Sequence, residues 1–182
     1  MKKIFLSLVG IALFVMQGYG QDIFIQGDRV INLSVGLGSG LYRGSAFSDI
    51  SPAIAASYEV GVVDNLFDEN SSLGVGGYLG YTGARQNFTG GYYKYSDIII
   101  GARGAVHYQF IDNLDTYGGL MLAYDIVSSK TTGTGVDVDA TSSGLVLDIF
   151  VGGRYYFTDQ VAGLVEIGSG IAYFNIGLAY KF

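Results

Sequence analysis

Residues 144–157 read GLVLDIFVGGRYYF, and the two faces of this stretch differ in chemical character. Successive side chains of a β-strand point to opposite faces of the sheet. One face here is bulky and uncharged, and it consists of Leu145, Leu147, Ile149, Val151, Gly153, Tyr155 and Phe157. The opposite face carries Asp148 and Arg154 among smaller and apolar residues. The stretch therefore predicts a strand with one apolar face and one face that holds charges.

The same alternation recurs along the chain. Glycine is frequent inside these apolar stretches, which argues against helices, where each glycine costs up to about 1 kcal/mol. Enrichment in Tyr, Val, Ile and Phe favours strands instead. We predict eight strands, at residues 30–41, 52–63, 72–84, 96–110, 116–128, 144–157, 161–168 and 172–182.

The connections between these strands alternate in kind. Asp64-Asn65, Asp112-Asn113 and Asp159-Gln160 mark the second, fourth and sixth connections. Longer polar stretches rich in Gly and Ser lie between them, at residues 42–51, 85–95 and 129–143. Short turns at one end and longer loops at the other are typical of up-and-down membrane barrels.

Two kinds of closed barrel are compatible with one bulky face. A soluble ligand-binding barrel would bury the bulky face, but its wet face would then be mostly Gly and Ala, which makes a poor solvent surface. A membrane barrel turns the bulky face to lipid and packs small and charged residues inside. We therefore predict an all-β fold, an eight-stranded antiparallel up-and-down transmembrane β-barrel.

The composition supports this interpretation. The 182 residues include 29 Gly and no Cys, and only 14% are charged, where about 25% is usual. The apolar content of 49% excludes a disordered chain. The absence of Cys excludes disulfides and thiolate chemistry. The net charge of −6 and the lack of a basic stripe argue against nucleic-acid binding.

The first residues have the layout of a secretory signal peptide. Lys2 and Lys3 precede an apolar run from Ile4 to Met16, and small residues flank Tyr19 before Gln21. The run is shorter than the roughly 18–20 residues that a membrane helix needs. We expect residues 1–20 to be the signal peptide and residues 21–182 the barrel domain.

Seven charged side chains fall on the face predicted to line the lumen. They are Glu59, Arg103, Asp125, Asp148, Arg154, Glu166 and Lys181. Side chains nearly fill an eight-stranded barrel, and an unpaired buried charge is costly. We expect Arg103 to pair with Asp125, and Arg154 with Glu166 or Asp148. The favoured interpretation is a structural plug of salt bridges, and the alternative is a narrow porin-like path for ions or small solutes.

Aromatic pairs close three of the predicted strands. Each is a Tyr-x-Phe whose two rings share the lipid-facing parity: Tyr108 with Phe110, Tyr155 with Phe157, and Tyr180 with Phe182. Rings at one end of a membrane barrel form an interfacial girdle. These six residues are the predicted girdle.

The sequence offers little catalytic chemistry. His107 is the only histidine, and its place near the predicted periplasmic end of a strand favours a polar lumen residue over a catalytic one. No Gly-x-Ser-x-Gly elbow is present. With one His and no Cys, no transition-metal cluster is credible. We expect no enzyme activity, no cofactor and no metal.

The chain resembles the small outer-membrane β-barrel family, the OmpA/OmpX-type domains, over residues 22–182. The most specific part is its ending, where Phe174, Ile176, Leu178, Tyr180 and Phe182 alternate with smaller or polar residues. This ending is similar to the signal read by the barrel-assembly machinery, so the resemblance implies insertion by that machinery into outer-membrane lipid. We expect a monomer that serves envelope structure, or surface adhesion through loops 42–51, 85–95 and 129–143.

Overall fold

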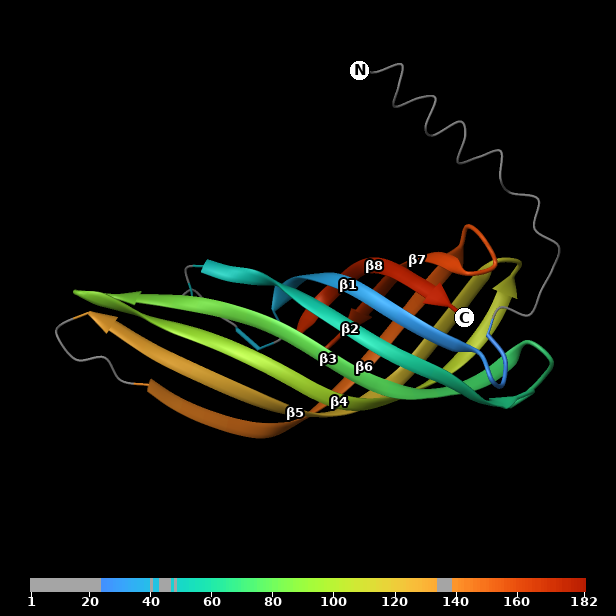
Figure 1. Ribbon diagram of the computed structural model, residues 1–182, viewed down its shortest axis with the longest axis horizontal. Helices are drawn as coiled ribbons and strands as arrows, with labels where there is room; N and C mark the ends of the chain where they lie inside the picture. The colour runs from blue at the N-terminus through green and yellow to red at the C-terminus, as the bar shows by residue number, and fades with distance from the viewer. Residues whose placement is uncertain (1–23, 40, 43–46, 48, 134–138) are drawn as a thin grey trace, which may run out of the picture.

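The computed structural model describes residues 24–182, apart from residues 40, 43–46, 48 and 134–138. Eight antiparallel strands pair in chain order and β1 closes on β8, which confirms the predicted barrel (Figure 1). The strands are β1 Arg29–Ser39, β2 Asp49–Asp64, β3 Ser71–Phe88, β4 Gly91–Ile111, β5 Leu114–Gly133, β6 Asp139–Tyr156, β7 Val161–Gly168 and β8 Ala172–Lys181. The predicted signal peptide, residues 1–20, lies outside the described residues.

In the described residues, no helix has the length and hydropathy that would let it cross a membrane.

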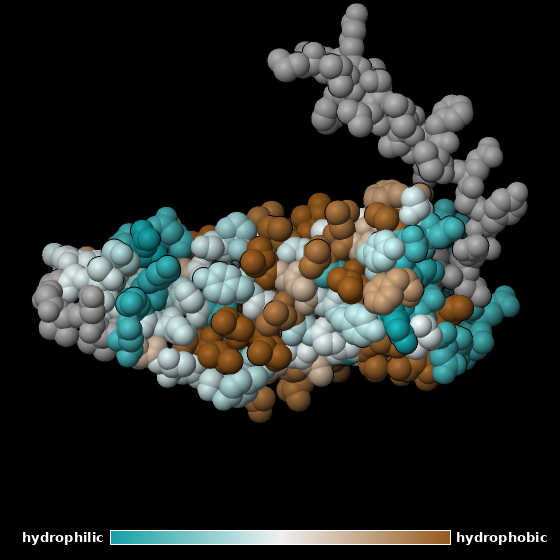
Figure 2. Space-filling model, viewed as in Figure 1, coloured by the Kyte–Doolittle hydropathy of each residue, from teal (hydrophilic) through white to brown (hydrophobic). Residues whose placement is uncertain are grey.

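The bulky faces of the strands point outward, as the alternation predicts. On β6, Leu145, Leu147 and Ile149 are exposed, whereas Phe150 and Asp148 are buried. Figure 2 shows hydrophobic residues gathered along the middle of the visible face, with hydrophilic residues toward the two ends. The surface is therefore apolar where an ordinary soluble domain would be polar.

Glycines on the inner face let neighbouring strands and lumen side chains come close together. A Cβ added to Gly76 would lie 2.0 Å from the carbonyl oxygen of Tyr58, and one added to Gly74 would lie 2.9 Å from the Glu59 carboxylate. Both contacts are too short for a real side chain. The inner glycines thus provide the space in which the large lumen side chains fit.

The turns at the end of the barrel that holds the C-terminus are short (Figure 1). Asn65 and Asn113 adopt positive φ values of 52° and 63°, a conformation that Asn tolerates better than most residues. The connection after β4 is the tightest, because Ile111 pairs directly with Leu114. The Asp-Asn dipeptides therefore mark turns for a conformational reason.

The strands at the opposite end are longer than predicted. Residues 85–95 were predicted to form a loop, but β3 and β4 pair continuously from Arg85–Lys94 to Phe88–Gly91. The predicted loops 42–51 and 129–143 also contribute residues 49–51, 129–133 and 139–143 to strands. These predictions were wrong because both faces of the sheet are polar here, so the apolar alternation that identifies a strand is missing. Strands β3 to β6 consequently protrude beyond β1, β7 and β8 (Figure 1).

Candidate functional site

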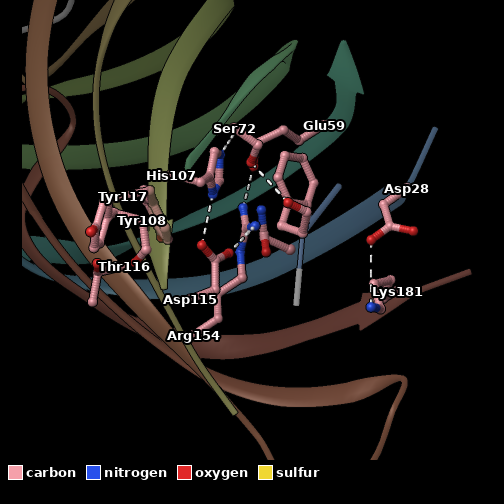
Figure 3. A network of polar contacts seen from close by, with 12 residues as sticks. Asp28, Glu59, Ser72, His107, Tyr108, Asp115, Thr116, Tyr117, Arg154 and Lys181 are labelled. Carbon is pink, nitrogen blue, oxygen red and sulfur yellow. Dashed lines mark hydrogen bonds and ion pairs between the residues drawn. The ribbon is translucent and has the colours of Figure 1, made fainter. Parts of the chain in front are cut away.

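A closed ring of ionisable side chains fills the lumen near the end that holds the C-terminus (Figure 3). Arg154 Nη1 donates to Asp115 Oδ2 at 3.0 Å, and Arg154 Nη2 donates to Glu59. His107 bridges the same two carboxylates, with Nδ1 2.8 Å from Asp115 and Nε2 3.1 Å from Glu59. All four side chains are buried. They come from β2, β4, β5 and β6, so this cluster joins strands on opposite sides of the barrel.

The segment before β1 covers part of the mouth beneath this ring and buries Phe24 there. The Phe24 ring lies 4.1 Å from the His107 ring, measured between centroids. Ser72 Oγ donates to the Phe24 carbonyl oxygen at 2.8 Å, and backbone bonds join Gly27 and Asp28 to Gly61. Gly61 is required here, since its Cβ would lie 2.1 Å from the Ile25 carbonyl oxygen. Residues 24–28 therefore form an N-terminal plug held by the barrel wall.

A second ion pair fills the middle of the lumen. Arg103 Nη2 donates to Glu166 Oε2 at 2.7 Å, and Tyr117 donates to the same oxygen at 3.0 Å. The Arg103 guanidinium lies over the Phe150 ring, 3.9 Å from its centroid. A cation over an aromatic face is stabilised by the ring quadrupole. This layer closes the lumen above the Arg154 ring.

The specific pairings predicted from sequence were wrong. Arg103 pairs with Glu166 and not Asp125, and Arg154 pairs with Glu59 and Asp115. The prediction paired neighbouring strands. Asp115 does lie directly opposite Arg154 on the neighbouring strand β5, but Glu59 and Glu166 lie across the narrow barrel, within reach of the long guanidinium side chains. The register also sets Arg103 beside Met121, so Asp125 lies a full four positions farther along β5.

The outer part of the lumen holds carboxylates without close cations. Tyr42 donates its hydroxyl hydrogen to Asp97, and burial together with this carboxylate raises the pKa of the Tyr42 phenol. Asp148 accepts from the Ser169 backbone N–H at 2.7 Å and from its hydroxyl at 2.8 Å. Within the described residues, Asp125 Oδ1 has no hydrogen-bond partner. The outer lumen is thus acidic, whereas the deeper layers pair their carboxylates with Arg103, Arg154 and His107.

The remaining predicted residues occupy the places that the alternation indicates. Lys181 lies 3.5 Å from Asp28 at the mouth that the N-terminal plug partly covers. The predicted girdle pairs lie at the turn end of the barrel, with ring centroids 4.6, 5.8 and 6.2 Å apart in chain order. Phe174, Ile176, Leu178, Tyr180 and Phe182 are exposed along β8. The roles of these residues in the girdle and in assembly remain predictions.

Three functional side chains were missed from sequence. Asp115 has the same parity as Asp125 on β5, but the predicted strand began one residue too late to include it. Asp97 has the inward parity of Ile99 on β4 and could have been included. Phe24 precedes the first strand, and no local pattern indicates that its ring enters the lumen.

The His107 cluster does not have the geometry of a nucleophilic active site. Both ring nitrogens of His107 contact carboxylates, so neither is available to take a proton from a hydroxyl group. The adjacent Ser72 hydroxyl donates to the Phe24 carbonyl oxygen. In the part of the chain that the structure describes, no three His, Cys, Asp or Glu side chains are grouped to hold a metal ion.

Comparison with known proteins identifies the fold. No protein-family model matches the chain, and no curated protein matches it in sequence. One similar solved structure is that of Ail, the attachment invasion locus protein of Yersinia pestis, in complex with the heparin analogue sucrose octasulfate. It aligns with a TM-score of 0.55 at 10% identity, and the alignment covers 87% of this chain and 100% of Ail. A de novo designed transmembrane β-barrel aligns with a TM-score of 0.50 at 17% identity, covering 90% of this chain and 100% of the design. The chain therefore has the fold of the small eight-stranded outer-membrane β-barrels.

Proposed function

We propose that the protein is a non-catalytic outer-membrane barrel with a sealed lumen, which binds partner proteins at the cell surface through the protruding part of strands β3 to β6. The outward apolar face supports membrane insertion, since a closed barrel leaves no backbone edge unpaired in lipid. Because side chains fill the lumen, a structural role is favoured and a conducting pore is not. The outer-membrane location is further supported by the signal peptide expected at residues 1–20.

The open edge of β6 is the observation that carries the surface role. Strand β7 pairs with β6 only from Phe150 to Tyr156. Residues 139–148 pair with β5 on one side, and no described strand pairs with their other side. Unpaired N–H and C=O groups along a strand edge are a template for another chain. We name residues 139–145 of this edge, which lie beyond the lipid-facing positions 147, 149 and 151, the β6 edge.

The opposite edge of the protruding sheet is protected, which makes the β6 edge distinctive. On β2, Pro52 and a register shift between Ser51 and Ile54 interrupt the strand where it extends beyond β1. Proline and bulges are the usual means by which proteins block edge pairing. The β6 edge has neither proline nor a register shift against β5. One edge of this sheet is therefore blocked and the other is available.

The direction of the backbone groups indicates which residues would bind. Ile149 exchanges hydrogen bonds with Ser169 on the β7 side, donating through its N–H and accepting at its carbonyl oxygen. Because strand residues alternate, the N–H and C=O groups of Thr141, Ser143 and Leu145 face the open side, beyond the lipid-facing positions 147, 149 and 151. Leu145 is also 75% exposed. The partner favoured by this surface is an extended protein segment with apolar residues at alternate positions.

Selection of peptides from a displayed library on the purified barrel tests this role. The double variant T141P/L145P removes two donors from the open side, while the ladder to β5 stays intact. Peptides enriched on the wild-type barrel should be lost on T141P/L145P and kept on the matched control T141V/L145V, which retains both N–H groups. Equal retention on all three proteins would refute β6-edge binding.

A narrow cation path is the second candidate function, and the acidic outer lumen favours it. Asp97, Asp125 and Asp148 would attract cations to the outer mouth. The Arg103 and Arg154 layers block the route to the other end. Planar-bilayer recording separates the two functions: the sealed barrel shows no steady openings, whereas steady cation-selective openings that change in an R103Q variant would establish the channel.

A further inference from the structure

Three of the cations in the described residues lie in one row on the outer face of the protruding strands. Arg85 on β3 pairs in register with Lys94 on β4, and Lys94 pairs with Lys130 on β5. Direct cross-strand neighbours have Cβ atoms about 5 Å apart. All three side chains are exposed. We name these three residues the cation row.

In the part of the chain that the structure describes, the cation row contains every Lys and Arg at the end of the barrel opposite the C-terminus. Arg103 and Arg154 are buried in the lumen, and Arg29 and Lys181 lie at the end that holds the C-terminus. Like charges placed directly opposite each other destabilise a sheet. A chain with only ten Lys and Arg residues nevertheless aligns three of them. The arrangement is therefore unfavourable for the isolated barrel, and an anion between the strands would relieve it.

Internal compensation of the row is only partial. Asp49 faces Arg85 at one end of the row, and Asp139 faces Lys130 at the other. The Lys130–Asp139 pair spans 3.8 Å with side chains 59% and 70% exposed, and such exposed pairs contribute little. Arg85 stacks on the Tyr92 ring at 4.6 Å. Lys94, at the centre, has a cation in register on each side.

The outer face below the cation row changes character in two steps. Nearest to the row, the register aligns Gly83, Ser96, Ser128 and Thr141, three of which carry hydroxyl groups. The next outward layer aligns Tyr81, Ile98 and Ile126, which belong to the apolar belt. A shallow hollow of about 360 Å³ lies over the hydroxyl layer beside Lys94 and Lys130, and the Asp139 carboxylate also lines it.

This order of layers matches the chemistry of one kind of lipid. Acyl chains would lie on the apolar layer, sugar hydroxyls on the hydroxyl layer, and phosphate on the cation row. The row lies four residues along each strand from the belt, which is about 10 Å of height for a tilted strand. That height is just outside the hydrocarbon, where headgroups lie. We propose that the cation row binds the phosphate of a phosphorylated glycolipid in the outer leaflet, an inference that rests on the proposed membrane insertion.

Titration of the folded barrel in detergent with diphosphoryl lipid A tests this site. The variant R85Q/K94Q/K130Q should bind on the order of 100-fold more weakly, as expected for the loss of three interfacial cations. The variant D49N/D139N, which removes only the flanking acids, should bind as tightly as wild type or more tightly. Arg29→Gln, which removes an outward cation at the other end, should leave the affinity unchanged.

Three results would overturn the proposal. The first is that the triple variant binds the glycolipid as tightly as wild type. The second is that the glycolipid stripped of its phosphates binds equally well. The third is that inorganic phosphate displaces the glycolipid at equal concentration, because this would indicate a site for a soluble anion. If the triple variant does not fold, the single variant Lys94→Gln tests the site in its place, and its affinity for the glycolipid should fall about 5-fold. Heat-modifiable migration on gels reports folding separately, so a failure of the membrane barrel itself is distinguished from a failure of this site.

Discussion

Arg154 on β6 and Glu59 on β2 form an ion pair between strands on opposite sides of the barrel, with side chains only 0% and 1% exposed. Asp115 binds the other end of the same guanidinium group at 3.0 Å. Breaking a buried ion pair on one side leaves an uncompensated charge, which costs more than the pair itself contributes. Substituting one member of the lumen network should therefore lower the stability of the barrel more than substituting an exposed charged residue.

Replacing Arg154 by Met should destabilise the barrel by about 3–5 kcal/mol, because Glu59 and Asp115 would both lose the guanidinium group that pairs with them in the interior. The measurement is the urea midpoint of the heat-modifiable folded band. Lys181→Met removes a partly exposed pair with Asp28 and should cost about 1 kcal/mol or less. Equal losses in the two variants would show that burial of the network does not matter.

Replacing Phe24 by Ala should destabilise the barrel by about 3 kcal/mol, the cost of truncating a buried aromatic ring. The ring is 6% exposed and covers His107. Ile25→Ala is the matched control, since Ile25 is 39% exposed and should tolerate truncation. Urea unfolding of both variants checks this, and an unaffected midpoint for Phe24→Ala would mean that the N-terminal plug does not pack as described.

Gly76→Ala should destabilise the barrel by about 1–3 kcal/mol, the usual cost of inserting a group into a packed site. Its Cβ would lie 2.0 Å from the Tyr58 carbonyl oxygen, while nothing lies within 4 Å of a Cβ added to Gly144. Gly144→Ala should therefore leave the urea midpoint unchanged or raise it slightly. The reverse order of the two midpoints would contradict the close approach of β2 and β3.

The fold could be predicted because the membrane imposes a pattern on every strand. Leu147 and Asp148 must lie on opposite faces, and lipid tolerates only one of them. The protruding strands around Lys94 carry no such pattern, since water accepts polar residues on both faces, and the sequence therefore predicts loops there.

The lumen partners could be predicted only in part. Parity places Arg103 and Glu166 inside the barrel, but their pairing depends on the diameter of the lumen and on the heights of the strands. The position of Phe24 depends on how the chain folds back over a mouth that forms only when the barrel closes. Partners of this kind are set by tertiary geometry and leave no local signal.

The central claim is that the barrel turns its bulky face to lipid and encloses its charges. Because the chain has no cysteine, single cysteines can be introduced along β6 at residues 147 to 151 and labelled with a fluorophore in reconstituted vesicles. Quenching by a lipid-borne quencher should alternate with a period of two residues, strong at 147, 149 and 151 and weak at 148 and 150. Uniformly weak quenching along the strand, or strong quenching at residue 148, would contradict this account.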